Sequence, residues 1–187
     1  INGLRCKANG LRSTGTAAGY GGINIGHNSA GNTADDSIIE NVHSHSNSGW
    51  GVVVAGSARV QLRGVYSALN VNPNVYIFDA STACKIDGLV SSGSTAGSGV
   101  LITAGTGHSI ANAEIFGNFA HGVDAETGTQ VVLDMTVRCY NNGQGAAGLA
   151  GVLLNGSVGS SCYAECFDNQ GTKTQGYGVW LSGGSGN

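Results

Sequence analysis

Two carboxylates stand two residues apart in the segment HGVDAETGT, residues 121–129, at Asp124 and Glu126. In an extended strand, such residues point to the same side and their Cα atoms lie ~6.6 Å apart. Their carboxyl groups can reach the separation of roughly 6.5–9.5 Å used by inverting glycoside hydrolases, or swing closer as in retaining ones. Mutual repulsion would raise the pKa of one of them, which suits a general acid. We therefore predict an acid–base pair; two acids on a solvated strand, or a device against unwanted strand pairing, are the structural alternatives.

Three histidines extend this set of candidates. His121 begins the same strand and could orient water or substrate. His43 and His45, in VHSHS, share one face of a strand and are expected to point outward beside Tyr66 of the next repeat. Two histidines at this spacing can begin a metal site, but the sequence shows no third ligand near them. We expect a polar or sugar-contacting stripe there, and we predict no metal and no cofactor.

The five cysteines are an odd number, contain no CxxC pair and do not suggest a disulfide framework. Cys139 and Cys166 occupy equivalent places in RCYNNG and ECFDNQ, so they should lie on adjacent repeats. A disulfide and a pair of buried free thiols both fit this placement. The same register predicts an ion pair between Arg138 and Glu165. Asp168 falls at a turn, where capping of backbone amides is its expected role.

The strand that carries the two acids is one copy of a repeat of 23–29 residues. Each copy has a short strand, a turn with Asn or Ser, a strand that usually begins Gly-Val, and a Gly-Ser or Gly-Thr corner. The valines form one column: Val52, Val75, Val100, Val123, Val152 and Val179. The turn residues form another: Asn47, Asn70, Ser94, Asn118, Asn142 and Asn169. Two columns with the same period predict stacked coils that contact only their neighbours.

This pattern resembles the right-handed parallel β-helix superfamily, which includes pectate-lyase-like enzymes, epimerases and bacteriophage tailspikes. The resemblance is carried by SIIENVHSHSNSGWGVVVAGS and by CYNNG followed by CFDNQG, and it covers residues 37–181. It implies an all-β fold: a single-stranded right-handed parallel β-helix of about seven coils with 23–29 residues per coil. We expect one domain over 1–187, with a looser N-terminal coil over 1–36 and regular coils over 37–187.

Strand alternation places the residues that follow the valines on the outer face. The first outward column is Val53, Tyr76, Leu101, Asp124, Leu153 and Trp180, and the second is Ala55, Phe78, Thr103, Glu126, Asn155 and Ser182. Three uses fit a face this apolar: packing of three solenoids together, a sugar-binding groove, or a cover made by a neighbouring loop. In the groove reading, Tyr76, Phe78 and Trp180 are flat platforms that position sugar rings.

Composition excludes several classes of function. The chain has 187 residues, 33 glycines, one proline and a net charge of −3, with only eight Lys and Arg. Such a charge argues against nucleic acid as a partner. No apolar run approaches the ~18 residues of a membrane span, so we expect no membrane insertion. The basic residues are scattered and the aspartate repeats of calcium-binding solenoids are missing, which disfavours a calcium-dependent lyase.

The resulting prediction is a phage tailspike-like protein that binds a bacterial surface polysaccharide. Depolymerisation of that polysaccharide would be its enzymatic activity. The protein would work as a homotrimer in an extracellular location or at the virion surface. A non-catalytic structural or adhesive solenoid, and a secreted polysaccharide lyase or epimerase, stay open as alternatives. The sequence begins with Ile1 and shows no capping helix at either end, so we expect it to be a piece of a longer chain.

Overall fold

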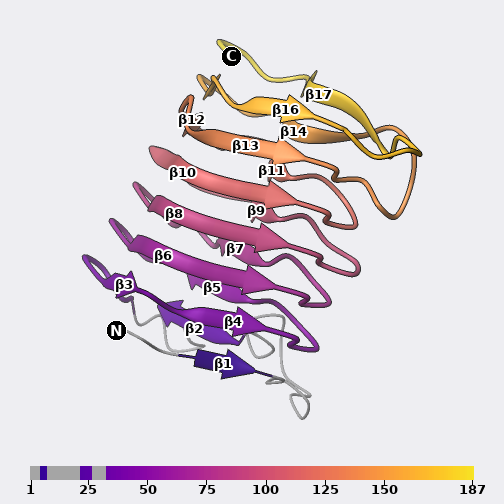
Figure 1. The fold of residues 1–187 in the computed structure, drawn as a ribbon. Helices are drawn as coiled ribbons and strands as arrows, with labels where there is room; N and C mark the ends of the chain where they lie inside the picture. Colours follow the sequence, from indigo (N-terminus) through magenta and orange to yellow (C-terminus); the bar gives the residue numbers. More distant parts are fainter. Residues whose placement is uncertain (1–4, 8–21, 27–32) are drawn as a thin grey trace.

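The computed structural model describes residues 5–7, 22–26 and 33–187, and these wind into a parallel β-solenoid of about six turns (Figure 1). The described residues form strands, turns and bends and contain no helix. In particular, none of their segments is a helix long and apolar enough to cross a membrane. The predicted all-β solenoid, with one coil per repeat, is confirmed.

The strands belong to two parallel sheets, here called sheet A and sheet B. The ten strands of sheet A are β1 (Arg5–Lys7), β3 (Ile38–Glu40), β4 (His43–His45), β6 (Gln61–Ala68), β8 (Lys85–Ser92), β10 (His108–Phe116), β12 (Val131–Leu133), β13 (Val137–Tyr140), β15 (Ser161–Cys162) and β16 (Glu165–Phe167). The seven strands of sheet B are β2 (Ile23–Gly26), β5 (Val52–Ala55), β7 (Val75–Phe78), β9 (Val100–Ile102), β11 (Val123–Ala125), β14 (Leu149–Asn155) and β17 (Gln175–Ser182).

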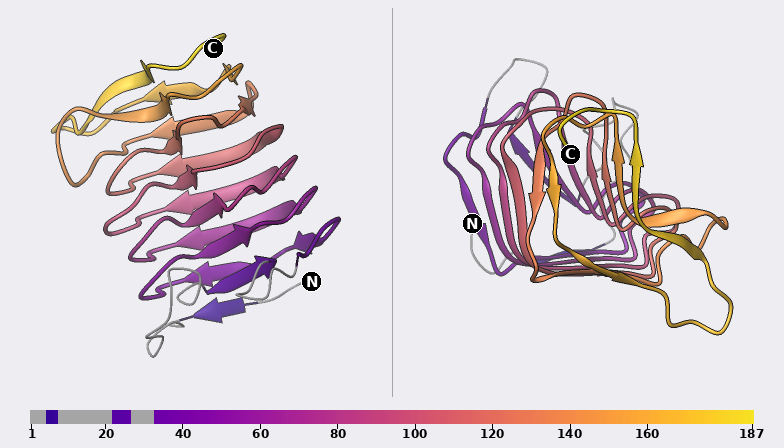
Figure 2. Two further views of the ribbon diagram at one scale, coloured as in Figure 1. Left: turned by 180° about the vertical axis from the view of Figure 1, so that it is seen from behind. Right: turned by 90° about the horizontal axis from the view of Figure 1, so that it is seen from above.

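The two sheets lie on opposite sides of the solenoid. Sheet A faces the viewer in Figure 1 with sheet B behind it, and the view along the axis shows the two sets of strands on either side of the interior (Figure 2). Each coil contributes to both sheets, so a residue's sheet depends on which part of the repeat it occupies. The outer surfaces of sheets A and B are therefore different faces of the molecule.

The register of sheet B confirms the valine column. Val52, Val75 and Val100 pair in sequence, and the column continues through Val123 and Val152 to Val179. All but the last are fully buried, and with the inward residues of sheet A they form one apolar core along the axis. Val179 is partly exposed because β17 pairs with a strand on one side only.

A left-handed residue bends the part of four consecutive coils that forms sheet A. Asn41, Gly64, Gly88 and Asn112 all have positive φ angles, between 49° and 73°, and follow residues that stack in register. Glycine adopts this conformation without a steric penalty and asparagine does so at a lower cost than most residues. These bends lie within or between the strands of sheet A, at positions other than the Asn turns and Gly-Ser corners that the sequence predicts.

Buried amide side chains form a hydrogen-bonded ladder at the turn between the sheets. Asn47 Nδ2 donates to Asn70 Oδ1 at 2.8 Å, and Asn118 Nδ2 donates to Asn142 Oδ1 at 3.0 Å. At the coil where Ser94 stands, the amide comes instead from Asn74, whose Nδ2 donates to Asn118 Oδ1 at 2.9 Å. The gap in the sequence pattern is therefore filled in space by the residue that directly precedes β7.

Asn169 lies in the connection that follows β16, where the column of turn residues predicts it, but its side chain does not join the ladder. Its side chain is exposed and accepts a hydrogen bond from Asn141 Nδ2 at 2.8 Å, outside the ladder. Gln175 takes the last position, because its Oε1 accepts from the backbone N of Asn142 at 3.3 Å. In this connection Asp168 accepts backbone hydrogen bonds from Gln170 and Thr174, which shape the turn around Asn169.

The expected looser coil over 1–36 falls mostly on residues 1–4, 8–21 and 27–32, which lie outside the described residues. Within the described part, β2 pairs with β5 in the same register as the later coils, with Ile23 opposite Val52. The side chains of Ile23 and Ile25 join the core. At least this strand of the first coils is regular.

Candidate functional site

The structure gathers five of the eight candidate residues on the outer face of sheet B. Tyr76 is opposite Leu101, which is opposite Asp124. The column continues through Leu153 to Trp180. Phe78 and Glu126 belong to the second outward column of the same sheet. The face predicted from strand alternation is thus confirmed as a geometric unit.

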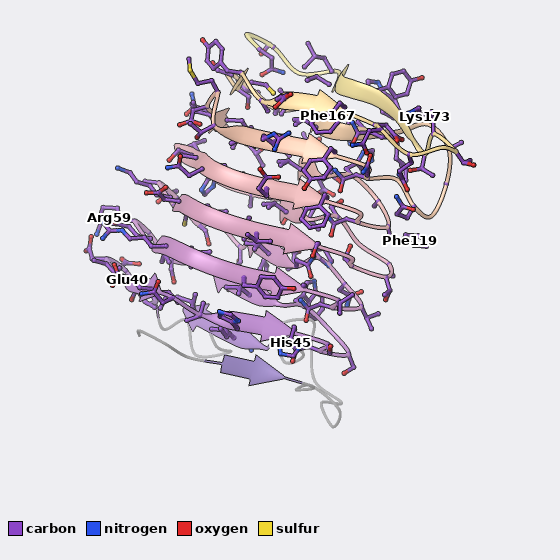
Figure 3. All side chains as sticks on the ribbon, viewed as in Figure 1. Glu40, His45, Arg59, Phe119, Phe167 and Lys173 are labelled. Atoms are coloured by element: carbon purple, nitrogen blue, oxygen red, sulfur yellow. The ribbon has the colours of Figure 1, made fainter. Side chains whose placement is uncertain are left out.

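The other outward-facing candidates, His43 and His45, lie on β4 of sheet A and therefore on the opposite side of the solenoid (Figure 3 labels His45). His43 packs against Tyr66 with ring centroids 5.3 Å apart, so the predicted neighbour is confirmed. His45 Nδ1 lies 3.4 Å from Ser46 Oγ. The structure does not bring these two histidines together with the acid pair.

Asp124 is the polar interruption of an apolar column. Its neighbours in register are Leu101 on one side and Leu153 on the other. Its Oδ1 is buried and has no hydrogen-bond partner in the described part of the chain. Burial, assisted by the negative charge of Glu126, raises the pKa of Asp124 from 3.8 to about 6. A carboxyl group in this state can carry a proton in mildly acidic water.

Glu126 is held at the end of the strand by its backbone. Its N–H donates to Ile102 O at 2.9 Å, which continues the pairing of β11 with β9. Its carbonyl accepts from Thr129 Oγ1 at 2.6 Å and from Thr129 N at 3.1 Å. The side chain is half-buried and directly follows Ala125, the last residue of β11. The hydrogen bonds from Thr129 therefore fix the backbone position of Glu126, and with it the point from which the second carboxylate projects.

Aromatic clusters flank the acid pair along the face. Tyr76 stacks between Trp50, at 5.9 Å, and Phe78, at 4.7 Å between ring centroids. Two coils beyond Asp124, Trp180 lies 5.1 Å from Tyr177. At ~4.8 Å per coil, Asp124 is ~10 Å from each cluster along the axis. Sequence reasoning had Tyr76, Phe78 and Trp180 but missed Trp50 and Tyr177, which lie outside the outward columns.

Part of the apolar face is already covered by this chain. Val53 is only 1% exposed and Leu153 only 7%, although both point outward. The ring of Trp180 lies 6.5 Å from that of His121, two coils below, so the indole extends across the coil of Leu153. The indole of Trp180, rather than a neighbouring loop, therefore contributes to the burial of Leu153. Leu101 stays half-exposed.

His121 serves the backbone rather than the outer surface. It is 7% exposed, and its Nδ1 accepts a hydrogen bond from Ala150 N at 2.9 Å. Burial lowers the pKa of His121, so the ring is neutral at pH 7. The imidazole joins two coils beside the acid pair and holds the ring of Trp180 nearby.

Sheet A carries an aromatic ladder that sequence reasoning missed. Phe116, Tyr140 and Phe167 stack in consecutive coils with centroids 5.0 and 4.9 Å apart and planes within 6° of parallel (Figure 3 labels Phe167). Arg138 lies beside it and pairs with Glu165 at 2.9 Å, as predicted, and also with Glu114 at 3.1 Å. The sequence signal that could have revealed this ladder is a third column of residues, these three aromatic ones, with the period of the repeat. Because each ring stacks on the ring of the next coil, the ladder stabilises the contacts between these coils.

The cysteines of the core are free thiols. Cys139 and Cys166 pair in register, so of the two predicted arrangements the structure has the unbonded one. A hydrogen bond to Cys166 and complete burial raise the pKa of Cys139 well above its ordinary value.

Asp168 caps the backbone as predicted, through Thr174 N at 2.8 Å and Gln175 N at 2.9 Å. Among the described residues no group of three His, Cys, Asp or Glu side chains is placed to hold a metal ion.

Comparison with protein-family models, with curated proteins and with solved structures gave no match to this chain. The likeness to the parallel β-helix superfamily consequently rests on the architecture alone, and an architecture of this kind carries many functions. Any function has to be argued from the site.

Proposed function

We propose that the chain is a polysaccharide-binding solenoid of the tailspike type, which hydrolyses a bacterial surface glycan on the outer face of sheet B. The observation that carries the proposal is Asp124, a carboxyl group whose buried oxygen has no hydrogen-bond partner among the described residues. It lies beside a second acid, at the middle of a face with aromatic clusters at both ends. An extracellular or virion location and a homotrimeric state belong to the same proposal and rest on the resemblance.

The cost of Asp124 to stability supports a functional role. An apolar residue would continue the column between Leu101 and Leu153 without leaving a buried polar atom unpaired. Buried, unpaired titratable groups lower stability, and they concentrate at functional sites, where their altered pKa serves catalysis or binding. A raised pKa is the property that a general acid needs near neutral pH.

The chemistry divides between the two carboxyl groups. Protonated Asp124 would donate its proton to the glycosidic oxygen as the bond to the anomeric carbon breaks. Ionised Glu126 would either remove a proton from the attacking water or attack the anomeric carbon itself, and water would complete the reaction in both cases. The aromatic clusters would bind the sugars on either side of the cleaved bond through their edges and free faces.

The first test is cleavage of purified bacterial surface polysaccharides, measured as new reducing ends. Asp124→Asn and Glu126→Gln are expected to abolish cleavage while keeping the fold. Glu114→Gln is the matched control, since it removes a carboxylate from the outer face of sheet A and should leave cleavage unchanged. Equal activity in all four proteins, or no activity on any glycan, would contradict hydrolysis at this site.

A second function, a structural or adhesive solenoid without catalysis, is favoured by a different observation. The Tyr76 ring stacks with two other rings, those of Trp50 and Phe78, which leaves less ring surface for a sugar. In that case the half-exposed Leu101 and its surroundings would pack against further copies of the chain. Sedimentation across a concentration series, with Leu101→Asn as the variant, tests this: assembly that weakens in the variant favours the structural role.

A further inference from the structure

The two faces of the solenoid differ in charge. In the outward columns of sheet B, from β2 to β17, the only charged residues are Asp124 and Glu126. Asp79, which directly follows β7, adds a third acid next to this face. No Lys or Arg stands in either column. His121, nearby, is buried and neutral.

The cations lie elsewhere. Arg63, Lys85 and Arg138 belong to β6, β8 and β13 of sheet A. Arg59 and Lys173 stand in connections between the sheets, and Figure 3 shows them at opposite edges of the molecule. These five are all the Lys and Arg residues whose side chains the structure describes.

Most of these cations are also paired where they stand. Arg59 contacts Asp36 at 2.6 Å, and Arg63 contacts Glu40 at 3.2 Å. Lys173 donates to the carbonyl of Asp168 at 2.6 Å. Bringing any of them to the face of sheet B would require breaking these contacts and crossing an edge of the solenoid.

We infer that the glycan bound on sheet B is uncharged, and that polymers of uronic acids, sialic acids or sulfated sugars are excluded. This rests on the proposed function and names its substrate class. A polyanion would place negative groups beside Asp124 and Glu126, and none of the described Lys or Arg side chains lies on this face to offset the repulsion. An uncharged sugar polymer offers hydroxyl groups to the carboxylates and apolar ring faces to Leu101 and the aromatic clusters.

The same charge distribution separates hydrolysis from elimination. Elimination in a uronate chain removes the proton next to the sugar carboxylate, and that step is helped by positive charge placed where the negative charge develops. The side chains of this face supply only negative charge. An acid–base pair acting on an uncharged glycosidic bond needs no such cation.

The experiment compares matched polymers that differ only in charge. Two pairs of polymers are passed over the immobilised protein. The first pair is dextran and dextran sulfate; the second is a neutral bacterial polysaccharide before and after oxidation of its primary hydroxyls to carboxylates. Retention of the neutral members and loss of at least tenfold in affinity for the charged ones, relieved in part by added salt, is the expected result. Cleavage of the same polymers is followed in parallel as new reducing ends.

Leu101→Lys is the variant with an added positive charge, because it places a cation in register with Asp124. It should increase retention of the anionic polymers, whereas Val90→Lys, an outward position on β8 of sheet A, should not. Retention of the anionic members as strong as that of the neutral ones in the unmodified protein would overturn the inference and leave the hydrolytic proposal standing. Selective retention of neutral polymers without cleavage would support the inference and contradict hydrolysis. Retention of no polymer would overturn both.

Discussion

At the scale of single residues, Asp124 stands where ionisation is disfavoured. Its neighbours in register are leucines, and its buried oxygen has no partner in the described chain. Since its pKa is about 6 in the folded protein and 3.8 in the unfolded reference, the native state binds the extra proton between these values. The contribution of this group to stability is therefore complete below about pH 4 and is lost as the pH rises through 6.

Asp124→Leu should consequently stabilise the protein at pH 7.5 and have little advantage at pH 4. A shift of about two pKa units corresponds to about 3 kcal/mol, so the gain of the variant over the original should grow by roughly that amount between the two pH values. Denaturant unfolding at both pH values measures it. Glu126→Gln removes only the smaller cause of the shift and should recover a fraction of this gain. A stability difference that does not depend on pH would show that Asp124 is not strained by ionisation.

The same proton governs the proposed reaction. If protonated Asp124 is the acid, the rate of cleavage should fall above about pH 6, approaching tenfold per pH unit. The measurement is the initial rate of reducing-end formation between pH 4 and pH 8 on a neutral glycan. A rate that stays constant through pH 8 would assign the acid to another group.

At the scale of elements, the amide ladder joins the coils at the turn that leads into sheet B. Asn118 accepts from Asn74 Nδ2 and from Ser94 N and donates to Asn142 Oδ1, all without access to water. Asn118→Ala leaves several buried groups unpaired, and we expect a loss of about 2–4 kcal/mol in unfolding free energy. Asn155→Ala, at an exposed position that ends β14, is the control and should change stability by less than ~0.5 kcal/mol. Similar losses in both variants would remove the ladder's special role.

The ladder also predicts a compensating pair of residues. Elsewhere the residue before the valine column is glycine, for example Gly51 and Gly99, and a Cβ there would approach the ladder amides within 2.6–2.8 Å. In the coil of β7, Asn74 takes this place; in the following coil, Ser94 takes the ladder position and the amide of Asn74 fills it.

Asn74→Gly alone should destabilise the protein, since the ladder then has a gap. Ser94→Asn alone should also destabilise it, because two amides would compete for one space. The double variant restores the arrangement of the other coils and should be more stable than either single variant. A double-mutant cycle in urea measures the coupling, and additive effects would contradict the arrangement.

These elements show which features could be predicted from sequence. The valine column and the shared face of Asp124 and Glu126 follow from strand alternation within a regular repeat, and both are observed. The role of Asn74 could not be derived in this way, because its amide crosses to the next coil and bonds a residue 44 positions away. The displacement of Asn169 depends on the caps made by Asp168, which are particular to the connection after β16.

The candidate site was predictable to a similar extent. Periodicity places residues on an inner or outer face but does not say how far a corner turns the chain. For that reason His43 and His45 were grouped with the acid pair although they lie on the other sheet. The buried oxygen of Asp124 depends on the packing of Leu101 and Leu153 around it, which alternation alone does not measure.

At the scale of the whole molecule, each inner strand of sheet B is hydrogen-bonded to two neighbours and β17 to one. In a solenoid the stability of a coil is approximately its own plus that of its interfaces, so coils with one interface open first. Amide hydrogen exchange followed by mass spectrometry should show the greatest protection in β7, β9 and β11 and the least in β17. The exposure of Val179 and Leu181 agrees with this order, since their inward side chains are covered on one side only. Equal protection along the axis would mean that all coils unfold as one cooperative unit; in that case Asp124→Leu should raise the protection of β17 as much as that of β11.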